Sequence, residues 1–250
     1  MILNGKAFLA EAQAAIDKVA ATQGPAVSAA AALVAASLRG GGVVQAFGSG
    51  HSEALSMEIA GRAGGLVATN RIALRDLVLR GGADPEILAD PKLERDPQIA
   101  ARLYELTNVH PEDVFVLTSN SGVNGTVIEL ALLVKERGHD LIAVTSMSHT
   151  MAVPTKHPSG KRLVDLADVV LDNGAPFGAA TLPLPGGGSV GAVSSITGAL
   201  LAQQVVVEAV GLMLAEGLRP PVYLSSNIPG GDEHNHELEA RYAGRIRRTA

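Results

Sequence analysis

The chain has 250 residues, of which 47% are hydrophobic, so it can build one α/β domain with a full core. The formal net charge is -5, and acidic and basic residues are spread along the sequence, which argues against the extended positive surface that DNA or RNA binding requires. There is no cysteine, and this excludes disulfides, thiolate catalysis and zinc sites built from cysteine.

Neither the N-terminus nor the longest apolar segment has the pattern of a membrane-bound or exported protein. Residues 1–21 form an Ala-rich helical pattern that Glu11 and Asp17 interrupt, whereas a signal peptide needs a continuous apolar core. The apolar segment 190–218 contains several polar residues, Glu208 among them, which favours a long helix buried in the protein or at a subunit interface over a membrane span. We therefore expect a cytoplasmic protein that has no membrane partner.

Residues 1–40 are predicted to be a helical extension of the domain. Apolar periodicity indicates two Ala-rich helices, at about residues 5–22 and 25–39, and Gly24 and Pro25 mark the turn between them. Helices of this composition usually pack against other helices or form dimers.

From residue 43 onward, short apolar runs rich in β-branched residues alternate with helical periodicity. This alternation is typical of parallel strands joined by right-handed crossover helices, and it predicts a three-layer αβα sandwich with helices on both faces of the sheet. Ligands of such sheets bind at the carboxyl ends of the strands. The predicted strands are residues 43–47, 113–117, 141–144 and 167–171, and helices are predicted between them at about 51–63 and 126–137.

Residues 80–112 interrupt this alternation, because they are more charged and contain three Asp-Pro pairs. They predict a lid or a surface excursion that leads into a helix at about 98–106. The glycine-rich segment 185–188 predicts a hinge or loop before the long apolar helix. No shift of composition marks a second domain, so we expect one domain over residues 1–250, with a C-terminal tail and helix at 220–250.

The first candidate binding loop, Gly48–Ser52, follows the predicted strand at 43–47 and has the sequence GSGHS. Its glycines allow the backbone to approach a ligand closely, its hydroxyls can donate hydrogen bonds, and the amides at the start of the next helix attract an anion. The spacing matches neither the GxGxxG dinucleotide fingerprint nor the P-loop. Taken alone, the loop is equally consistent with an ordinary turn that Ser52 caps.

The second candidate loop, Thr118–Asn124, has the sequence TSNSGVN, and Thr126 follows just inside the next helix. Three hydroxyls and two amide side chains are more polar groups than one helix cap needs, and the loop contains no Lys or Arg. Such a cluster of neutral donors suits a phosphate ester. A solvated turn is the alternative, but the same arrangement occurs twice in one chain, which favours the binding hypothesis.

At these two loops the sequence resembles the sugar isomerase (SIS) domain family. Gly48–Ser52 is similar to the family's first glycine-serine loop, and Ser119–Gly122 is similar to its Ser-x-Ser-Gly phosphate loop. The likeness spans most of the chain from about residue 30 onward. The segments that resemble a poorly characterised phosphosugar-binding branch of the family are Arg62–Leu66, Ser119–Gly122 and His157–Lys161, and Ala143–Ser146 with Ser148 and His149 resembles the family's third strand and the turn after it.

The resemblance implies a flavodoxin-like sandwich with a five-stranded parallel sheet, assembled as a homodimer or homotetramer with its sites near the subunit interface. It also implies that the partner is a phosphorylated sugar. The substrate-binding residues expected from it are Gly48, Ser49, Ser52, Thr118, Ser119, Asn120, Ser121, Asn124 and Thr126.

Proton transfer on a sugar phosphate needs a base that removes the proton next to the carbonyl and an acid that protonates oxygen. Glu58 lies beside the apolar face of the predicted helix at 51–63, where partial burial would suit a general base. The alternative for Glu58 is an exposed i,i+4 ion pair with Arg62. His51, inside the first loop, is either a donor to a sugar oxygen or a turn residue.

The C-terminal segment Gly230–His236 has a density of polar side chains that the start of a plain helix does not need. His234 is predicted to be an acid or base that reaches a neighbouring subunit's site, with Glu233 or His236 as the second choice. A metal site from Asp232 and the two histidines lacks a further ligand, so no metal is expected. The alternative is a capped surface helix at about 232–248.

Two functions therefore stay open. The first is an enzyme that binds a hexose or amino-sugar 6-phosphate and abstracts a proton, as an aldose-ketose isomerase or as a lyase or dehydratase, without cofactor or metal. The second is a non-catalytic sugar-phosphate sensor, a role that the resemblance also implies. We predict that sugar phosphates bind in either case.

Overall fold

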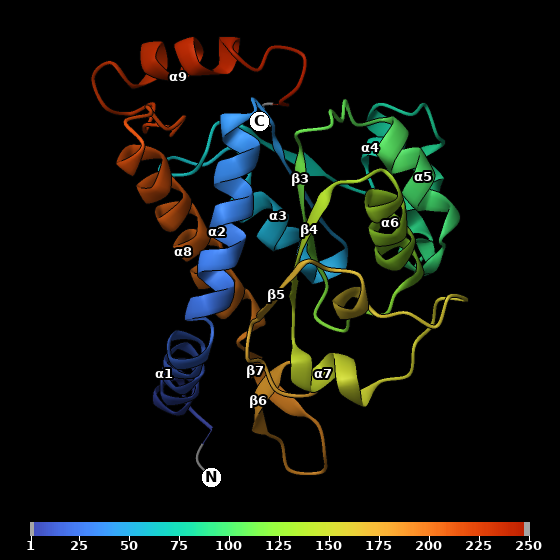
Figure 1. Cartoon of the computed structure of the whole chain (residues 1–250). Helices are drawn as coiled ribbons and strands as arrows, with labels where there is room; N and C mark the ends of the chain where they lie inside the picture. The colour runs from blue at the N-terminus through green and yellow to red at the C-terminus, as the bar shows by residue number, and fades with distance from the viewer. Residues whose placement is uncertain (1–2, 248–250) are drawn as a thin grey trace.

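The computed structural model describes residues 3–247, and a five-stranded sheet with the order β2-β1-β3-β4-β5 lies at its centre (Figure 1). All the neighbouring strands of this sheet are parallel. The strands are β1 (Val44–Gly48), β2 (Thr69–Ile72), β3 (Val114–Thr118), β4 (Asp140–Thr145) and β5 (Val169–Asp172), and a separate antiparallel hairpin consists of β6 (Ala180–Pro183) and β7 (Ser189–Ala192).

Helices cover both faces of the sheet, which confirms the predicted three-layer αβα sandwich. The α-helices are α1 (Gly5–Thr22), α2 (Gly24–Arg39), α3 (Glu53–Ile59), α4 (Asp76–Leu79), α5 (Gln98–Glu105), α6 (Gly125–Glu136), α7 (Met147–Ala152), α8 (Ser194–Ala215) and α9 (Gly231–Ala240). Short 3₁₀ helices are η1 (Gly50–Ser52), η2 (Pro85–Ala89), η3 (Leu93–Arg95) and η4 (Leu163–Asp165).

The central strands are buried on both faces, which explains why they read as continuous apolar runs. Side chains of a strand alternate between faces, so consecutive residues enter different cores. Val114 and Val116 of β3 pack with α2, α3 and α8, whereas Phe115 and Leu117 of the same strand pack with α5 and α6. The sheet is thus covered by α2, α3 and α8 on one side and by α5 and α6 on the other.

Strand β2 was not predicted from the sequence. Its sequence, TNRI, contains Asn70 and Arg71, and such residues are rare in buried strands. The fold accommodates Asn70 because its Nδ2 donates to Oε1 of Gln45 on β1, 3.1 Å away. A cross-strand hydrogen bond between two buried amides therefore replaces the apolar contact that the pattern analysis expects.

Two predicted helices are shorter in the structure. The helix expected at 51–63 begins as the 3₁₀ turn η1 and ends at Ile59, before Gly61, which has a φ of +80°. The helix expected at 232–248 is α9, which ends at Ala240, and its predicted end at Arg248 lies outside the described residues.

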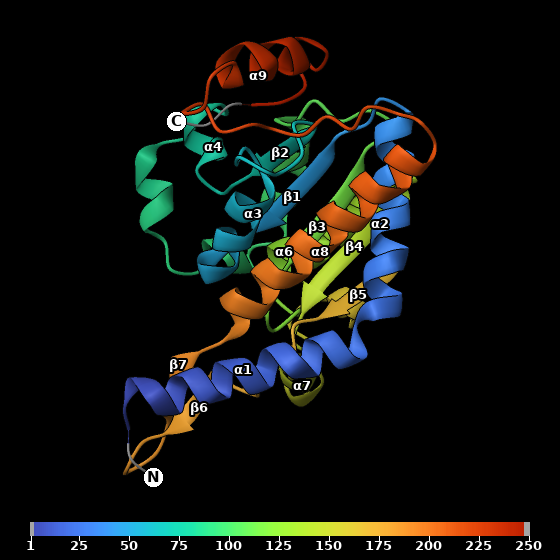
Figure 2. The ribbon, with the colours of Figure 1, turned by 90° about the vertical axis from the view of Figure 1, so that its left-hand side faces the viewer.

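The long apolar helix expected within 190–218 is α8, and the glycine-rich segment 185–188 before it forms the turn of the β6–β7 hairpin. By length and composition α8 could cross a membrane, but here it packs against α1, α2 and α3 as part of one layer of the sandwich. In Figure 2, α1 runs from the hairpin past α8 to the start of α2. A side chain at Gly191 of β7 would collide with the ring of Phe8, so α1 and the hairpin touch closely.

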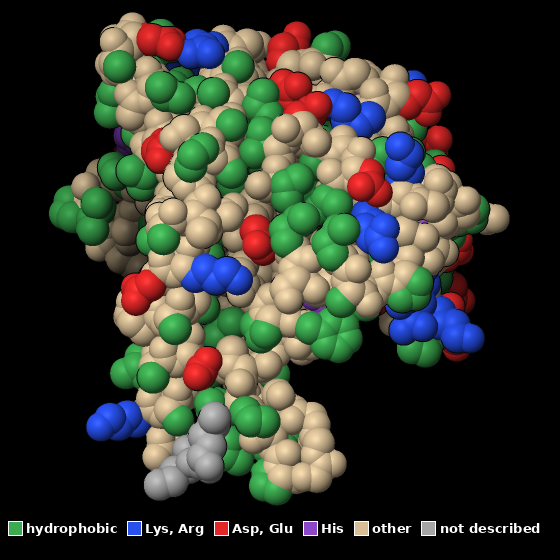
Figure 3. All heavy atoms as spheres, turned by 60° about the horizontal axis from the view of Figure 1, so that its bottom comes forward, with side chains coloured by type: hydrophobic (Ala, Val, Ile, Leu, Met, Phe, Trp, Pro, Cys, Tyr) green, Lys and Arg blue, Asp and Glu red, His purple; other side chains and the backbone are tan. Residues whose placement is uncertain are grey.

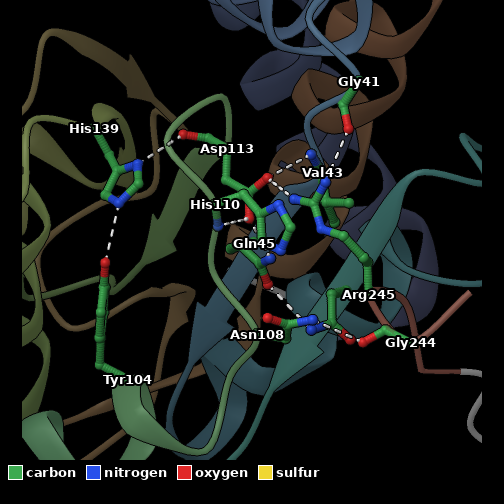
Figure 4. A network of polar contacts seen from close by, with 11 residues as sticks. Gly41, Val43, Gln45, Tyr104, Asn108, His110, Asp113, His139, Gly244 and Arg245 are labelled. Atoms are coloured by element: carbon green, nitrogen blue, oxygen red, sulfur yellow. Dashed lines mark hydrogen bonds and ion pairs between the residues drawn. The ribbon is translucent and has the colours of Figure 1, made fainter. Parts of the chain in front are cut away.

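A buried carboxylate holds the amino ends of the central strands (Figure 4). Asp113 is 2% exposed and accepts hydrogen bonds from the backbone N–H of Val43 (2.8 Å), Nε2 of Gln45 (2.9 Å) and the backbone N–H of His110 (3.1 Å). It also pairs with the guanidinium of Arg245, which comes from the C-terminal segment. The carboxylate of Asp113 thus links β1, the start of β3 and the C-terminal segment.

Replacing Asp113 with Ala is expected to lower the free energy of unfolding by about 3–5 kcal/mol, because the Arg245 guanidinium and the donors of the strands lose their shared acceptor. Chemical denaturation measured by circular dichroism tests this. The matched control is Asp140→Ala, since Asp140 is exposed at the start of β4. Equal stabilities of the two variants would contradict the assignment.

A second buried group, His139, lies beside Asp113. Nδ1 of His139 lies 3.1 Å from the carbonyl oxygen of Asp113, and Nε2 lies 3.0 Å from the hydroxyl of Tyr104 (Figure 4). A carbonyl can only accept, so Nδ1 donates and Nε2 of the neutral ring accepts from the tyrosine. Burial lowers the pKa of His139, in spite of the opposing effect of the nearby Asp113.

Because the pKa of His139 is lower in the folded chain than in the unfolded chain, the unfolded chain binds more protons at acid pH. The stabilisation from neutral His139 is therefore present above about pH 6.5 and is lost as the pH falls below it. Urea unfolding at pH 7 and pH 5 should show a smaller loss of stability for His139→Gln than for the wild type. Equal losses would show that His139 does not cause the effect.

Candidate functional site

The two predicted binding loops leave neighbouring strands at the same edge of the sheet. Gly48 at the end of β1 pairs with Thr118 at the end of β3, and both strands run in the same direction. Ser49 and Ser119 therefore directly follow the ends of these two adjacent strands. A side chain at Gly48 would collide with the carbonyl of Ser52, so only glycine allows the first loop to turn back on itself in this way.

A cavity of about 310 Å³ lies at this edge, and it is lined from both loops. The first loop and the helix after it contribute His51, Ser52 and Leu55, and the second loop contributes Thr118 and Asn120. The structure therefore brings four of the predicted site residues, His51, Ser52, Thr118 and Asn120, to one cavity.

Thr118 is the most informative of these residues, because its hydroxyl is buried and unused. The residue is 6% exposed, and its Oγ1 has no hydrogen-bond partner among the described residues. Leaving a buried hydroxyl without a partner costs about 1–3 kcal/mol. The residue lines the cavity, whereas its Oγ1 is itself shielded from solvent.

The turn of the second loop is held by its own serine. The backbone N–H of Gly122 donates to Oγ of Ser119 (3.1 Å), and Gly122 has a φ of +61°. A side chain at Gly122 would also crowd the hydroxyl of Thr150 behind it. Ser121 lies half-buried beside this turn, and its side chain makes no hydrogen bond within the described residues.

Of the nine residues predicted to bind substrate, three line the cavity, whereas Gly48, Ser49, Ser119, Ser121, Asn124 and Thr126 do not. Asn124 and Thr126 have partners elsewhere in the chain. Nδ2 of Asn124 donates to Oε1 of Glu94 (2.9 Å), and Oγ1 of Thr126 donates to the carbonyl of Asp96 (2.8 Å). Both partners belong to the excursion at 80–112. Asn124 and Thr126 thus anchor this excursion to the start of α6, where Gly125 leaves room for the backbone of Arg95.

The segment from the end of β5 to the first residues of α8 completes the cavity, and the sequence analysis did not assign these residues to the site. It contributes Asn173, Ala179, Ala192, Ser194 and Ser195. Nδ2 of Asn173 donates to Oδ1 of Asn120 (3.1 Å), which joins this segment to the second loop. Asn173 follows the end of a strand, so its position was the available signal, and the serines follow a hairpin that apolar periodicity did not reveal.

Glu58 lies on α3, one turn after the cavity residue Leu55. Its carboxylate forms an ion pair with Arg62 and accepts a hydrogen bond from Nε2 of Gln203 on α8 (2.8 Å). The side chain is 25% exposed, so it is accessible from outside. The predicted ion pair with Arg62 is present, and it leaves one carboxylate oxygen that takes part in neither contact.

His234 and its neighbours lie away from this cavity within the chain. They belong to α9, which Figure 1 shows beyond the opposite end of the sheet from α7 and the hairpin. Nε2 of His234 lies 3.0 Å from the carbonyl of Val222, and Nδ1 lies 3.3 Å from the guanidinium of Arg219. Within residues 3–247 no group of three or more His, Asp or Glu side chains could hold a metal ion.

No charged side chain of fixed sign lines the cavity, because His51 is its only ionisable lining residue among those described. Figure 3 turns this end of the molecule toward the viewer, and Lys, Arg, Asp and Glu side chains are interspersed there without a patch of one sign. An anion in the cavity would thus be held by hydroxyls, amides and helix ends rather than by Lys or Arg.

Comparisons with known proteins agree with this architecture. A UPF0309 protein of Listeria monocytogenes is 41% identical over 243 residues, which cover 97% of this chain and 98% of that protein. The structure of phosphoheptose isomerase GmhA from Neisseria gonorrhoeae is similar with a TM-score of 0.55 at 19% identity, over 82% of this chain and 96% of that one. The structure of a phosphoheptose isomerase from Francisella tularensis has a TM-score of 0.52 at 16% identity, over 82% and 95% of the two chains.

The model of the SIS domain matches residues 7–146, which include both loops and the strands that carry them. This match covers more than half of the chain, and the resemblance noted from the loops is thereby confirmed. The chain belongs to the SIS domain family.

Proposed function

We propose that the protein binds a phosphorylated sugar in the cavity between the two loops and catalyses proton transfer on it. The observation that carries the proposal is the cavity itself, which residues of the two loops line together at the carboxyl edge of a parallel sheet. Similar folds include two phosphoheptose isomerases, which supports a sugar phosphate as ligand.

The phosphate is best accommodated by the two serine loops. Ser49 and Ser52 belong to the turn that leads into α3, and Ser119 and Ser121 belong to the turn after β3. The backbone amides of such turns point outward and carry a partial positive charge, which suits a dianionic ester. A hexose or amino-sugar 6-phosphate would then extend from the loops along the cavity.

For the chemistry, Glu58 is the proposed base and His51 the proposed acid. Glu58 removes the proton from C2 of the open-chain sugar, the C–H electron pair forms the C1–C2 double bond, and the carbonyl oxygen takes a proton from His51. Return of the proton to C1 and loss of the proton of the C2 hydroxyl give the ketose. In a lyase or dehydratase the same intermediate instead expels a group that leaves with the electron pair and a proton.

The proposal also includes the role of His234, the oligomeric state, the location of the protein and the need for a cofactor. Since His234 lies beyond the other end of the sheet, it would act only from a second copy of the chain, in a homodimer or homotetramer whose sites lie near the interface. We infer a cytoplasmic protein, with no cofactor in the reaction. A non-catalytic sensor is the second candidate, and the engagement of Glu58 by Arg62 and Gln203 favours it, because a free base would be more reactive.

A matched pair of threonine variants tests ligand binding. Thr118→Val should leave the melting temperature of the free protein unchanged or raise it, because it removes an unpartnered hydroxyl. It should weaken binding of glucosamine 6-phosphate or glucose 6-phosphate about 2–10-fold, the value of one hydrogen bond. Thr126→Val should do the opposite, with a loss of about 1–2 kcal/mol of stability and little change in binding, because its hydroxyl donates within the fold.

Thermal shift and calorimetric titration measure both effects. If no sugar phosphate stabilises the wild-type protein, both the enzyme and the sensor are excluded. If Thr126→Val weakens binding as strongly as Thr118→Val does, the assignment of their hydroxyls is wrong.

Deuterium exchange separates enzyme from sensor. The wild-type protein should incorporate deuterium at C2 of a bound sugar phosphate in heavy water, as followed by NMR, and Glu58→Gln should slow this at least about 100-fold while binding persists. Glu53→Gln is the control, because Glu53 lies on the same helix but pairs with Arg75. Exchange that survives Glu58→Gln would remove Glu58 as the base, and binding without exchange in the wild type would favour the sensor.

A further inference from the structure

A second group of reactive side chains lies outside the cavity, where the chain leaves α7 and passes beneath α6 (Figure 1). Oγ of Ser159 lies 2.8 Å from Nδ1 of His157, and Nε2 of the same ring lies 2.8 Å from Oε2 of Glu129 on α6. His157 is 9% exposed, whereas Ser159 is exposed. We call these three residues the serine cluster. None of them lines the cavity between the loops, so the proposed sugar site makes no use of them.

The hydrogen bonds of the cluster determine which ring nitrogen carries the hydrogen. The backbone N–H of Ser159 lies 3.2 Å from Nδ1 of His157 and can only donate, so Nδ1 is the accepting nitrogen of the neutral ring. Nε2 then carries the hydrogen and donates it to the carboxylate of Glu129. The hydroxyl of Ser159 donates to Nδ1, because that nitrogen has no hydrogen to offer. A hydroxyl, an imidazole and a carboxylate in this order activate a serine as a nucleophile.

The oxygen of Ser159 keeps one lone pair for attack. It donates its hydrogen to the ring of His157 and accepts one hydrogen bond, from the backbone N–H of Lys161 (3.2 Å). A hydroxyl oxygen has two lone pairs, so the second has no partner among the described residues. Because Ser159 is exposed, small molecules reach this lone pair directly from solvent.

The turn that carries Ser159 is fixed before any reaction. The backbone N–H of Gly160 donates to the carbonyl of His157 (3.0 Å), and Gly160 has a φ of +69°. Three residues further on, the N–H of Leu163 donates to the carbonyl of Gly122 (2.9 Å), which joins the segment to the second loop. A nucleophile that is already oriented toward its base loses little freedom when it reacts.

The same turn limits the kind of substrate. The backbone N–H groups of Gly160 and Lys161 already donate within the turn, so neither is free to bind the negative oxygen of a tetrahedral intermediate. The loss of one such donor lowers the rate of acyl transfer by about 10²–10³-fold in other enzymes. The site therefore suits esters, whose alcohol departs readily, rather than amides.

We propose that Ser159 is a nucleophile that accepts acyl groups from small carboxylic esters, with His157 as its base and Glu129 as the residue that orients the ring. The serine oxygen attacks the carbonyl carbon, and its proton passes to Nδ1 of His157. The bond between that carbon and the alcohol oxygen breaks, and the alcohol leaves with the electron pair and the proton from Nδ1. Water then attacks the acyl group in the same way and releases the carboxylic acid and the free serine. This activity is separate from the proposed function.

A fluorophosphonate probe tests the nucleophile, because its phosphorus forms a stable bond with an activated serine oxygen and releases fluoride. Peptide mass spectrometry on the full-length protein should locate the label at Ser159 in the folded wild type and not in urea. His157→Gln should slow the labelling at least about 100-fold, and Glu129→Gln at least about tenfold. The wild type should also hydrolyse p-nitrophenyl acetate at least about tenfold faster than Ser159→Ala does.

Ser189→Ala is the matched control, since Ser189 is an exposed serine of β7 whose side chain forms no hydrogen bond with a described residue. It should keep the labelling and the hydrolysis of the wild type. Melting temperatures establish that each variant is folded, and Glu129→Gln decides the test if His157→Gln unfolds, because Glu129 is 41% exposed and its exchange leaves the core intact.

Three results would overturn the proposal. They are a wild type that is not labelled at Ser159, a labelling rate that Glu129→Gln leaves unchanged, and equal hydrolysis of the ester by the wild type and Ser159→Ala. Each of them leaves the sugar phosphate site untouched, since the serine cluster and the cavity share no residue.

Discussion

The site depends on one constraint, the parallel pairing of β1 with β3, which brings Gly48 and Thr118 to the same level at one edge of the sheet. Parallel strands end at a common edge, so loops 70 residues apart in the sequence become neighbours. At the other end of the strands the pairing is stabilised by Asp113, which accepts hydrogen bonds from Gln45 of β1 and from His110 in the segment before β3. A buried carboxylate far from the cavity thus helps to set the position of the loops.

Much of this arrangement follows from the sequence, because its strands are buried on both faces and appear as apolar runs. Residues 113–117 predicted β3 closely, and the glycines and hydroxyls after the strands predicted the loops. Strand β2 was missed because a hydrogen bond between Asn70 and Gln45 satisfies polar side chains that a pattern counts as unfavourable. The hairpin before α8 was missed because its short strands carry few apolar residues on a regular period.

Individual side-chain roles were harder to predict than the loops. Asn124 and Thr126 look like ligands of a phosphate in the sequence, but the fold uses them to hold the excursion at 80–112, whose position depends on tertiary contacts. Conversely, Ser194 and Ser195 carry no signal in a sequence where serine also begins many ordinary helices. Glu58 was placed correctly beside an apolar helix face, whereas its engagement by Gln203 of α8 could not be read from local spacing.

The close contact between Phe8 and Gly191 gives the first helix an influence on the ligand cavity that its place in the sequence does not suggest. Strand β7 ends at Ala192, a residue of the cavity wall, so α1 supports that wall from behind. A chain shortened or fused at its N-terminus would therefore retain both serine loops but would have an altered cavity wall at Ala192. A change in the first helix can therefore alter the cavity without any change in the two serine loops.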